Sequence, residues 1–296
     1  MDEQALGLRQ APVARMSTGF FADAWRRLRR NRAALGGLVL VGFLAVLAFL
    51  APIVAPSDPI AQDLDARLLP PSRQHWLGTD DLGRDLLSRI IYGGRVSLTV
   101  GIVSVSIALV AGTVLGLLAG FYAGWLDSVT MRTMDIMLAF PATLLAIFIV
   151  GIRGPGLNNA MLAIGVINIP IFARLVRASV LRVRQEEFVD AARALGAGQS
   201  RIIGRHIFPN TLAPIIVQAT LGIGAAILEA AGLSFLGLGA QAPTPEWGAM
   251  LTNTREFLRD APWAATFPGI AILLAVVGFN LFGDGLRDAL DPRLRQ

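Results

Sequence analysis

The chain has 296 residues, of which 54% are hydrophobic and 16% are charged, and its formal net charge is +5. Soluble domains are about 25% charged, and the apolar residues here form uncharged runs of about 20 residues or more, the length that crosses a bilayer. This composition therefore excludes a soluble globular domain, and the absence of cysteine excludes disulfides and thiolate chemistry. The runs are continuously apolar, so they predict an all-α protein rather than a β-barrel.

The first membrane helix is predicted at residues 33–55, an uncharged run that follows a polar segment, 1–32. This lead is too long for a cleaved signal peptide, whose apolar stretch has about 7–15 residues. It ends in WRRLRRNR, and these arginines hold the start of the helix in the cytoplasm by the positive-inside rule. A nucleic-acid patch is the alternative for such a basic run. We expect no nucleic acid as a partner, because the arginines lie beside apolar runs.

The next segment, 56–95, has mixed charge and several prolines, and it is predicted on the outer side of the membrane. Its last part, 81–92, has apolar residues at helical spacing and predicts an amphipathic helix on the membrane surface. Asp80, Asp81 and Arg84, with Asp85, could suggest a metal or peptide-terminus site. A turn and helix start with capping carboxylates is the preferred interpretation, so no metal site is predicted.

Five further spans follow in the core region 96–283, which gives six in all with both ends in the cytoplasm. Arginines after residue 173 and in the tail, 284–296, mark the inner side. A short cytoplasmic turn is expected at 127–135, with an ion pair between Asp135 and Arg132. An outer segment is expected at 232–263, whose first part, 232–245, could be re-entrant. The five spans are predicted at 96–126, 136–152, 154–173, 211–231 and 264–283.

A polar cytoplasmic loop, 185–210, interrupts the apolar second half of the chain. Gly196 is placed to end a first short helix, because a positive φ costs least at glycine. Ser200 is placed to cap a second helix that Pro209 limits. Small residues on the first helix would let a partner's surface come close, whereas an amphipathic connector lying on the lipid interface is the alternative. One face of the first helix is predicted from spacing i, i+3, i+4 and i+7: Phe188, Ala191, Ala192 and Leu195.

This loop resembles the EAA loop of ABC-importer permeases. That pattern runs Glu-Ala-Ala, three residues, Gly, nine residues, Ile, one residue, Leu-Pro. The chain has Asp190-Ala191-Ala192, then Gly196, and finally Phe208-Pro209 at the same spacing. It departs from the pattern at Asp190, at His206 and at Phe208, and of these only the aspartate keeps the charge. The resemblance implies that the following residues contact the ATPase: Glu187, Phe188, Asp190, Ala191, Ala192, Arg193, Leu195, Gly196, Ala197 and Pro209.

Residues 77–98 and 232–251, and the N-terminal region from about residue 25, resemble the C-type subunit of the dipeptide/oligopeptide permease family. The resemblance implies the transmembrane-domain fold of an ABC type I importer in a bacterial cytoplasmic (inner) membrane. It implies four partners besides the lipid bilayer: a B-type permease subunit in a heterodimer, two cytoplasmic ATPases and an extracytoplasmic substrate-binding protein. The resemblance implies that this chain forms half of the translocation pathway for di- or oligopeptides. Close relatives carry nickel and other solutes, so these are the alternative.

No cofactor is expected on this chain, and ATP and Mg would be held by the partner ATPases. A P-loop needs a lysine, and the sequence contains none. No catalytic residues are predicted, because the spans contain no Ser/His or paired-Asp constellation of a membrane-embedded enzyme. An ion-driven secondary transporter is the alternative from another class. Such proteins show paired broken helices and inverted repeats, and the sequence shows neither.

Polar residues within the spans are candidates for the translocation path. Glu229 is the clearest, because a carboxylate within a membrane span is by default a functional hypothesis. The alternative places it at the outer interface, solvated or paired with an arginine such as Arg255. Amides and hydroxyls in spans more often hold helices together through hydrogen bonds. The other candidates are Asn158, Asn168, Gln218 and Ser104.

Overall fold

The computed structural model describes residues 25–290, so most of segment 1–32 and the last residues of the tail 284–296 lie outside the described residues. The described chain is helical, with one isolated bridge between Thr79 and Asp85. The elements are α2 (Arg32–Phe49), α3 (Ala51–Val54), η1 (Leu64–Ala66), α4 (Leu86–Tyr122), α5 (Gly124–Ala139), α6 (Ala142–Arg153), α7 (Leu157–Val183), α8 (Glu187–Ala194), α9 (Gln199–Ile202), η2 (Ile203–Ile207), α10 (Phe208–Phe235), α11 (Trp247–Thr254), η3 (Arg255–Phe257) and α12 (Trp263–Leu290).

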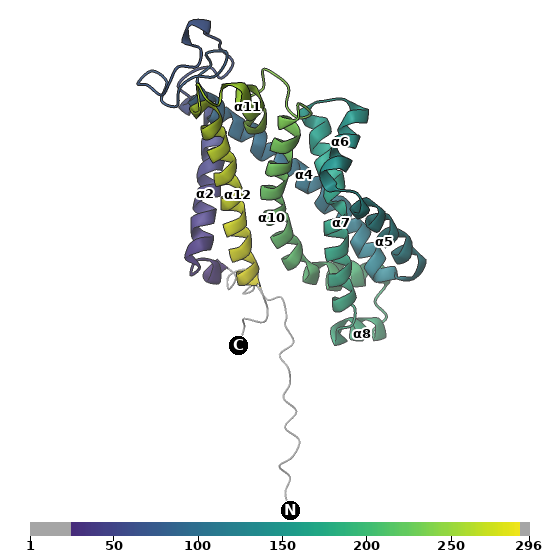
Figure 1. The fold of residues 1–296 in the computed structure, drawn as a ribbon. Helices are drawn as coiled ribbons and strands as arrows, with labels where there is room; N and C mark the ends of the chain where they lie inside the picture. The colour runs from purple at the N-terminus through teal and green to yellow at the C-terminus, as the bar shows by residue number, and fades with distance from the viewer. Residues whose placement is uncertain (1–24, 291–296) are drawn as a thin grey trace, which may run out of the picture.

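Within the described range, five helices are long and apolar enough to cross a membrane, and six spans result if the bent pair α5–α6 counts as one. This agrees with the predicted six-span, all-α architecture. Figure 1 shows α2, α12, α10 and α7 side by side, with α4 crossing behind them at a slant. Both ends of the described chain and α8 lie at one end of the bundle, and the outer segment and α11 lie at the other.

The prediction of a single helix for the third span, 136–152, is wrong. This segment is part of two helices, α5 and α6, which meet at an angle of 93°. Phe140 is extended, with φ −92° and ψ 141°, and Pro141 follows as the residue before α6. A proline disfavours helical backbone in the residue before it, which explains the bend. The predicted cytoplasmic turn at 127–135 is also wrong, because these residues are helical within α5.

The predicted surface helix at 81–92 is wrong as well, since its second half forms the first turns of α4. Asp85 caps that helix, and its Oδ2 accepts a hydrogen bond of 2.8 Å from the main-chain N–H of Ser88. This confirms the interpretation of Asp85 as a capping carboxylate. With 37 residues, α4 is about 55 Å long at 1.5 Å per residue. It exceeds the ~30 Å hydrocarbon layer and must tilt or protrude.

Glycines bring α4 and α7 into backbone contact. A Cβ built on Gly116 would lie 2.4 Å from the main-chain oxygen of Ala173, and one on Gly112 would lie 2.5 Å from the Cβ of Phe172. Both distances are shorter than atoms can approach without a shift of the backbone. Small residues allow such close approach between helices in lipid, so these glycines fix the spacing of the two helices.

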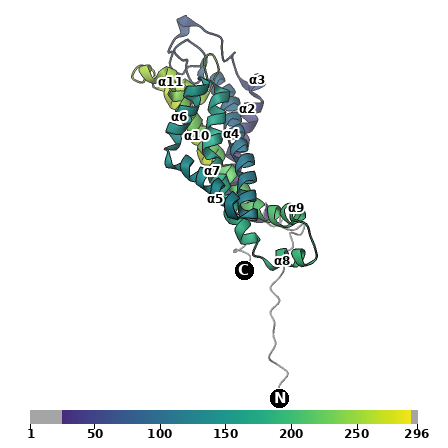
Figure 2. The ribbon, with the colours of Figure 1, turned by 90° about the vertical axis from the view of Figure 1, so that its right-hand side faces the viewer.

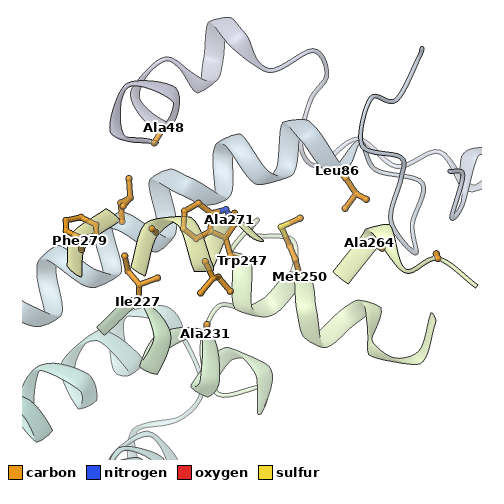
Figure 3. Packing of buried hydrophobic residues seen from close by; sticks show 13 residues of the cluster. Ala48, Leu86, Ile227, Ala231, Trp247, Met250, Ala264, Ala271 and Phe279 are labelled. Carbon is orange, nitrogen blue, oxygen red and sulfur yellow. The ribbon is translucent and has the colours of Figure 1, made fainter. Parts of the chain in front are cut away.

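Trp247 anchors the outer segment to the bundle. Its side chain is 1% exposed and belongs to a buried cluster with Ile227 of α10 and Phe279 of α12, which Figure 3 shows from close by. The indole Nε1–H donates a 3.0 Å hydrogen bond to the main-chain oxygen of Ile90. Glu246 is also buried, and its carboxylate caps α11 by accepting from the N–H groups of two following residues. These contacts fix α11 against α4, α10 and α12.

Candidate functional site

The first short helix of the cytoplasmic loop is α8, which projects from the bundle in both views (Figures 1 and 2). Gly196 follows its C-cap with φ +79°, the conformation expected from the sequence. Its N–H donates to the oxygen of Arg193 at 2.9 Å, and the N–H of Ala197 donates to the oxygen of Ala192 at 3.0 Å. This paired pattern satisfies the last carbonyls of a helix. The helix therefore ends sharply and has a defined shape where it projects from the bundle.

The two sides of α8 differ in burial. Val189 is fully buried and belongs to a cluster with Ile202 and Ile207, while Ala192 is 8% exposed. The predicted four-residue face is therefore corrected, because Ala192 turns towards the protein. A helix turns by 100° per residue, so Ala192 lies on the same side as Val189, three residues earlier. The other three members remain on the outside, with Phe188 37% and Leu195 88% exposed, and Ala191 also exposed.

Charged residues surround this exposed apolar patch, which we define as Phe188, Ala191 and Leu195. Glu187 and Asp190 lie in the first turn and are exposed, where their charge favours the helix dipole. Asp190 accepts a 2.9 Å hydrogen bond from Nη1 of Arg193, one turn later. An exposed apolar patch with a polar rim is the usual composition of a surface that binds another protein.

The second short helix does not stop at Pro209, so that prediction is wrong. A continuous helix runs from Gln199 to Phe235, because η2 is a π-helical segment that leads directly into α10. Pro209 lies in the first turn of α10, where the i→i+5 spacing of the π turn accommodates its missing N–H. Gly198 rather than Ser200 is the N-cap. Within this element the ring of His206 lies 6.4 Å from that of Phe188.

Two ion pairs join α5 to α7 just before the loop. Arg177 donates from Nε and Nη2 to the two carboxylate oxygens of Asp127, at 2.5 and 2.6 Å. Arg174 pairs with Asp135, which corrects the predicted pair of Asp135 with Arg132. The partners lie 39 and 50 residues apart in the sequence, so the spacing along one helix could not reveal them. Together they attach the bent arm α5–α6 to the helix that leads into α8.

Glu229 and Asn168 are brought together from α10 and α7. Asn168 Nδ2 donates to Glu229 Oε2 at 2.9 Å and to the main-chain oxygen of Ile164 at 3.0 Å. No salt bridge described within residues 25–290 includes Glu229, so the alternative pairing with Arg255 is not formed. Both side chains are half-buried. The carboxylate therefore lies between two spans, held by one amide.

The remaining path candidates lie elsewhere. Asn158 is exposed in the first turn of α7, and Gln218 is half-buried on α10. Ser104 is fully buried, and its Oγ has no hydrogen-bond partner, which places it inside the helix packing rather than on an open surface. Of the five candidates, the structure joins only Glu229 and Asn168 by a hydrogen bond.

A buried charge cluster fixes the outer segment to α4. Asp80 accepts a 2.7 Å hydrogen bond from Nε of Arg84, and Arg89 donates from Nη1 to the main-chain oxygen of Pro59 at 2.9 Å. All three charged side chains are 2–4% exposed. Burial, together with the neighbouring Asp80, raises the pKa of Asp81. The described residues contain no group of three acidic or histidine ligands that could hold a metal. The bond from Arg89 to Pro59 ties the outer segment to the first turns of α4.

Five to six apolar spans, an outer segment packed on them and an ordered loop at the other end define a multi-pass membrane protein. The chain belongs to the family described as the binding-protein-dependent transport system inner membrane component, whose model matches residues 112–296. Residues 19–71 match the N-terminal membrane domain of oligopeptide transport permease C. The predicted family and the inner-membrane localisation are thereby confirmed, and the chain is a permease subunit of an ABC importer.

Known proteins resemble the chain over nearly its whole length. It is 55% identical over 273 residues to the dipeptide transport system permease protein DppC of Alkalihalophilus pseudofirmus, covering 92% of this chain and 90% of that protein. It is 48% identical to the glutathione transport system permease protein GsiD of Pectobacterium atrosepticum, with 92% and 91% covered. A solved inward-facing structure of the MetNI methionine ABC transporter matches with a TM-score of 0.58 at 19% identity, over 69% of this chain and 96% of that one. This last likeness confirms the type I importer fold.

Proposed function

We propose that the chain forms one half of the membrane path of an ATP-driven importer of di- or oligopeptides. The observation that carries the proposal is the ordered α8, which presents an exposed apolar patch with a charged rim on the cytoplasmic side. The peptide substrate is supported by the relatives, whose names specify dipeptides and glutathione, itself a small peptide. Nickel and other solutes remain the alternative, and the solute assay below separates them.

The proposed partners follow from this architecture. A B-type permease subunit completes the path, two cytoplasmic ATPases bind ATP and Mg, and an extracytoplasmic binding protein delivers the peptide. This chain holds no cofactor and performs no catalysis. Its part is mechanical, because closure of the ATPases would push on α8 and alter the spacing of the spans behind it. The residues that form the contact are all exposed: Glu187, Phe188, Asp190, Ala191, Arg193 and Leu195. The shape of the loop depends on Ala192, Gly196, Ala197 and Pro209.

A reconstitution experiment tests the proposal. The chain is expressed with its genomic neighbours, and the purified complex is placed in proteoliposomes with the binding protein. We expect two ATPases to co-purify, and we expect ATP-dependent uptake of a radiolabelled dipeptide that stops when ATP or the binding protein is left out. Uptake of nickel without uptake of dipeptide would show that nickel is the solute instead of a peptide. Uptake by this chain alone, driven by an ion gradient, would contradict the importer mechanism.

A further inference from the structure

Glu229 is the only charged residue of α10. It lies six residues before the helix end at Phe235, about 9 Å along the axis at 1.5 Å per residue. The residues on either side of it, 225–228 and 230–233, are all uncharged, so the carboxylate lies in an apolar stretch of the helix. A carboxylate in such surroundings is costly unless a cation or several hydrogen-bond donors compensate it. Its position therefore needs an explanation beyond packing.

The compensation within this chain is incomplete. An ionised carboxylate can accept about four hydrogen bonds, and the described bonds of Glu229 amount to one, from Asn168. The amide nitrogen of Asn168 already uses its second hydrogen on Ile164. Asn168 can therefore orient the carboxylate but cannot satisfy it further. The remaining acceptor positions are open to a donor from outside this chain.

The neighbouring surface leaves room for such a donor. Ala225 and Leu228 are exposed on the same side of α10. Gly232, one turn after Leu228, is exposed too, and a Cβ built on it would meet nothing within 4 Å. Small and apolar groups therefore flank the carboxylate without covering it. The site consists of one acidic group on a surface that is otherwise uncharged.

We propose that Glu229, oriented by Asn168, binds the α-ammonium group of a peptide as it passes through the membrane. This inference rests on the proposed function. An ammonium supplies a compact positive charge and three donors, which match the open acceptor positions. A single carboxylate without a second acid also suits transport, since a path must bind its solute strongly enough to admit it and weakly enough to release it.

The test uses the complete complex and an isosteric variant. Glu229→Gln removes the charge but keeps an oxygen for Asn168, so the complex should still assemble. Dipeptide uptake should fall about tenfold or more, as expected when a charge-assisted hydrogen bond is lost. The matched control is Glu256→Gln, the same isosteric change at an exposed glutamate of η3 in the outer segment, which should keep wild-type uptake. Wild-type uptake in Glu229→Gln, with an active wild-type complex, would overturn this inference and leave the proposed function intact.

A labelling experiment identifies the group that is bound. Dicyclohexylcarbodiimide modifies carboxyl groups in apolar surroundings, and mass spectrometry reports the modification of Glu229. A dipeptide should slow this labelling several-fold, whereas the same dipeptide with an acetylated amino group should not. Equal protection by both peptides, or by neither, would contradict ammonium binding. Absence of labelling without peptide, together with lowered thermal stability of Glu229→Gln, would show a structural ion pair with the other permease subunit instead. If the wild-type complex takes up no dipeptide, the proposed function itself fails.

Discussion

Replacing Leu195 with alanine should weaken the attachment of the ATPases without disturbing the fold. The side chain is 88% exposed, so it contributes little to the stability of the free chain. Full burial of a leucine side chain is worth about 1.5–3 kcal/mol, and alanine recovers only part of this. If docking buries Leu195, the loss of about 1–2 kcal/mol raises the dissociation constant about 5- to 30-fold. Leu195→Asp should cost more, because it adds the desolvation of a charge.

The assay is a titration of the ATPases onto the permease pair in nanodiscs, followed by ATP hydrolysis and peptide uptake in proteoliposomes. Leu64→Ala is the matched control, since that leucine is 68% exposed but lies in the outer segment, and it should leave the dissociation constant unchanged. Thermal unfolding of both variants should match the wild type. An unchanged dissociation constant in both Leu195→Ala and Leu195→Asp would refute the reasoning that places α8 in the ATPase contact.

Two further variants test the helix packing behind the loop. Gly116→Leu should prevent folding, because even a Cβ would lie 2.4 Å from a main-chain oxygen of α7. Gly36→Leu should be tolerated, since nothing lies within 4 Å of a Cβ built on Gly36. The yield of monodisperse complex in size-exclusion chromatography measures both effects, and a well-folded Gly116→Leu would refute the close contact. Asp127→Asn should lower the free energy of unfolding by about 1–2 kcal/mol, which is the range for hydrogen bonds to charged groups reduced by partial exposure. The double variant Asp127→Arg with Arg177→Asp, which exchanges the two charges, should recover part of this loss in thermal unfolding.

The sequence predicted the architecture better than the shapes of individual helices. Uncharged runs and arginine clusters are sufficient to predict the six spans and to place the loop at the same end of the bundle as both ends of the described chain. These patterns could not show where α4 begins, because its first turns contain Arg89, and an arginine in the sequence predicts a polar surface. The outer segment buries this arginine, with Pro59 as its hydrogen-bond acceptor. Only the folded chain brings those groups together.

Prolines and ion pairs account for the other differences. Pro141 produces a 93° bend, whereas Pro209 is accommodated by a π segment, and the sequence contains no signal that separates the two outcomes. The pair of Arg174 with Asp135 depends on how α5 lies against α7. Local patterns were sufficient where the partners are close in sequence, as for the positive φ of Gly196 and the cap at Asp85. Such local patterns could not predict the hydrogen bond between Asn168 and Glu229, because the two residues are 61 positions apart in the sequence.

The loop and the Glu229 site are joined by one uninterrupted helix. The helix Gln199–Phe235 contains Glu229, and its length along the axis from Gln199 to Glu229 is about 45 Å at 1.5 Å per residue. Val189 of α8 packs on the start of this helix. Asn168 lies on α7, the helix that enters the same loop. We infer that a push on α8 changes the spacing of α7 and α10 and thereby the contact between Asn168 and Glu229. Because the chain has no cysteine, spin labels at Asn158→Cys and Phe235→Cys report the outer ends of these helices directly. Their distance should change between nucleotide-free and ATP-bound complexes, and an identical distance distribution in both states would contradict this coupling.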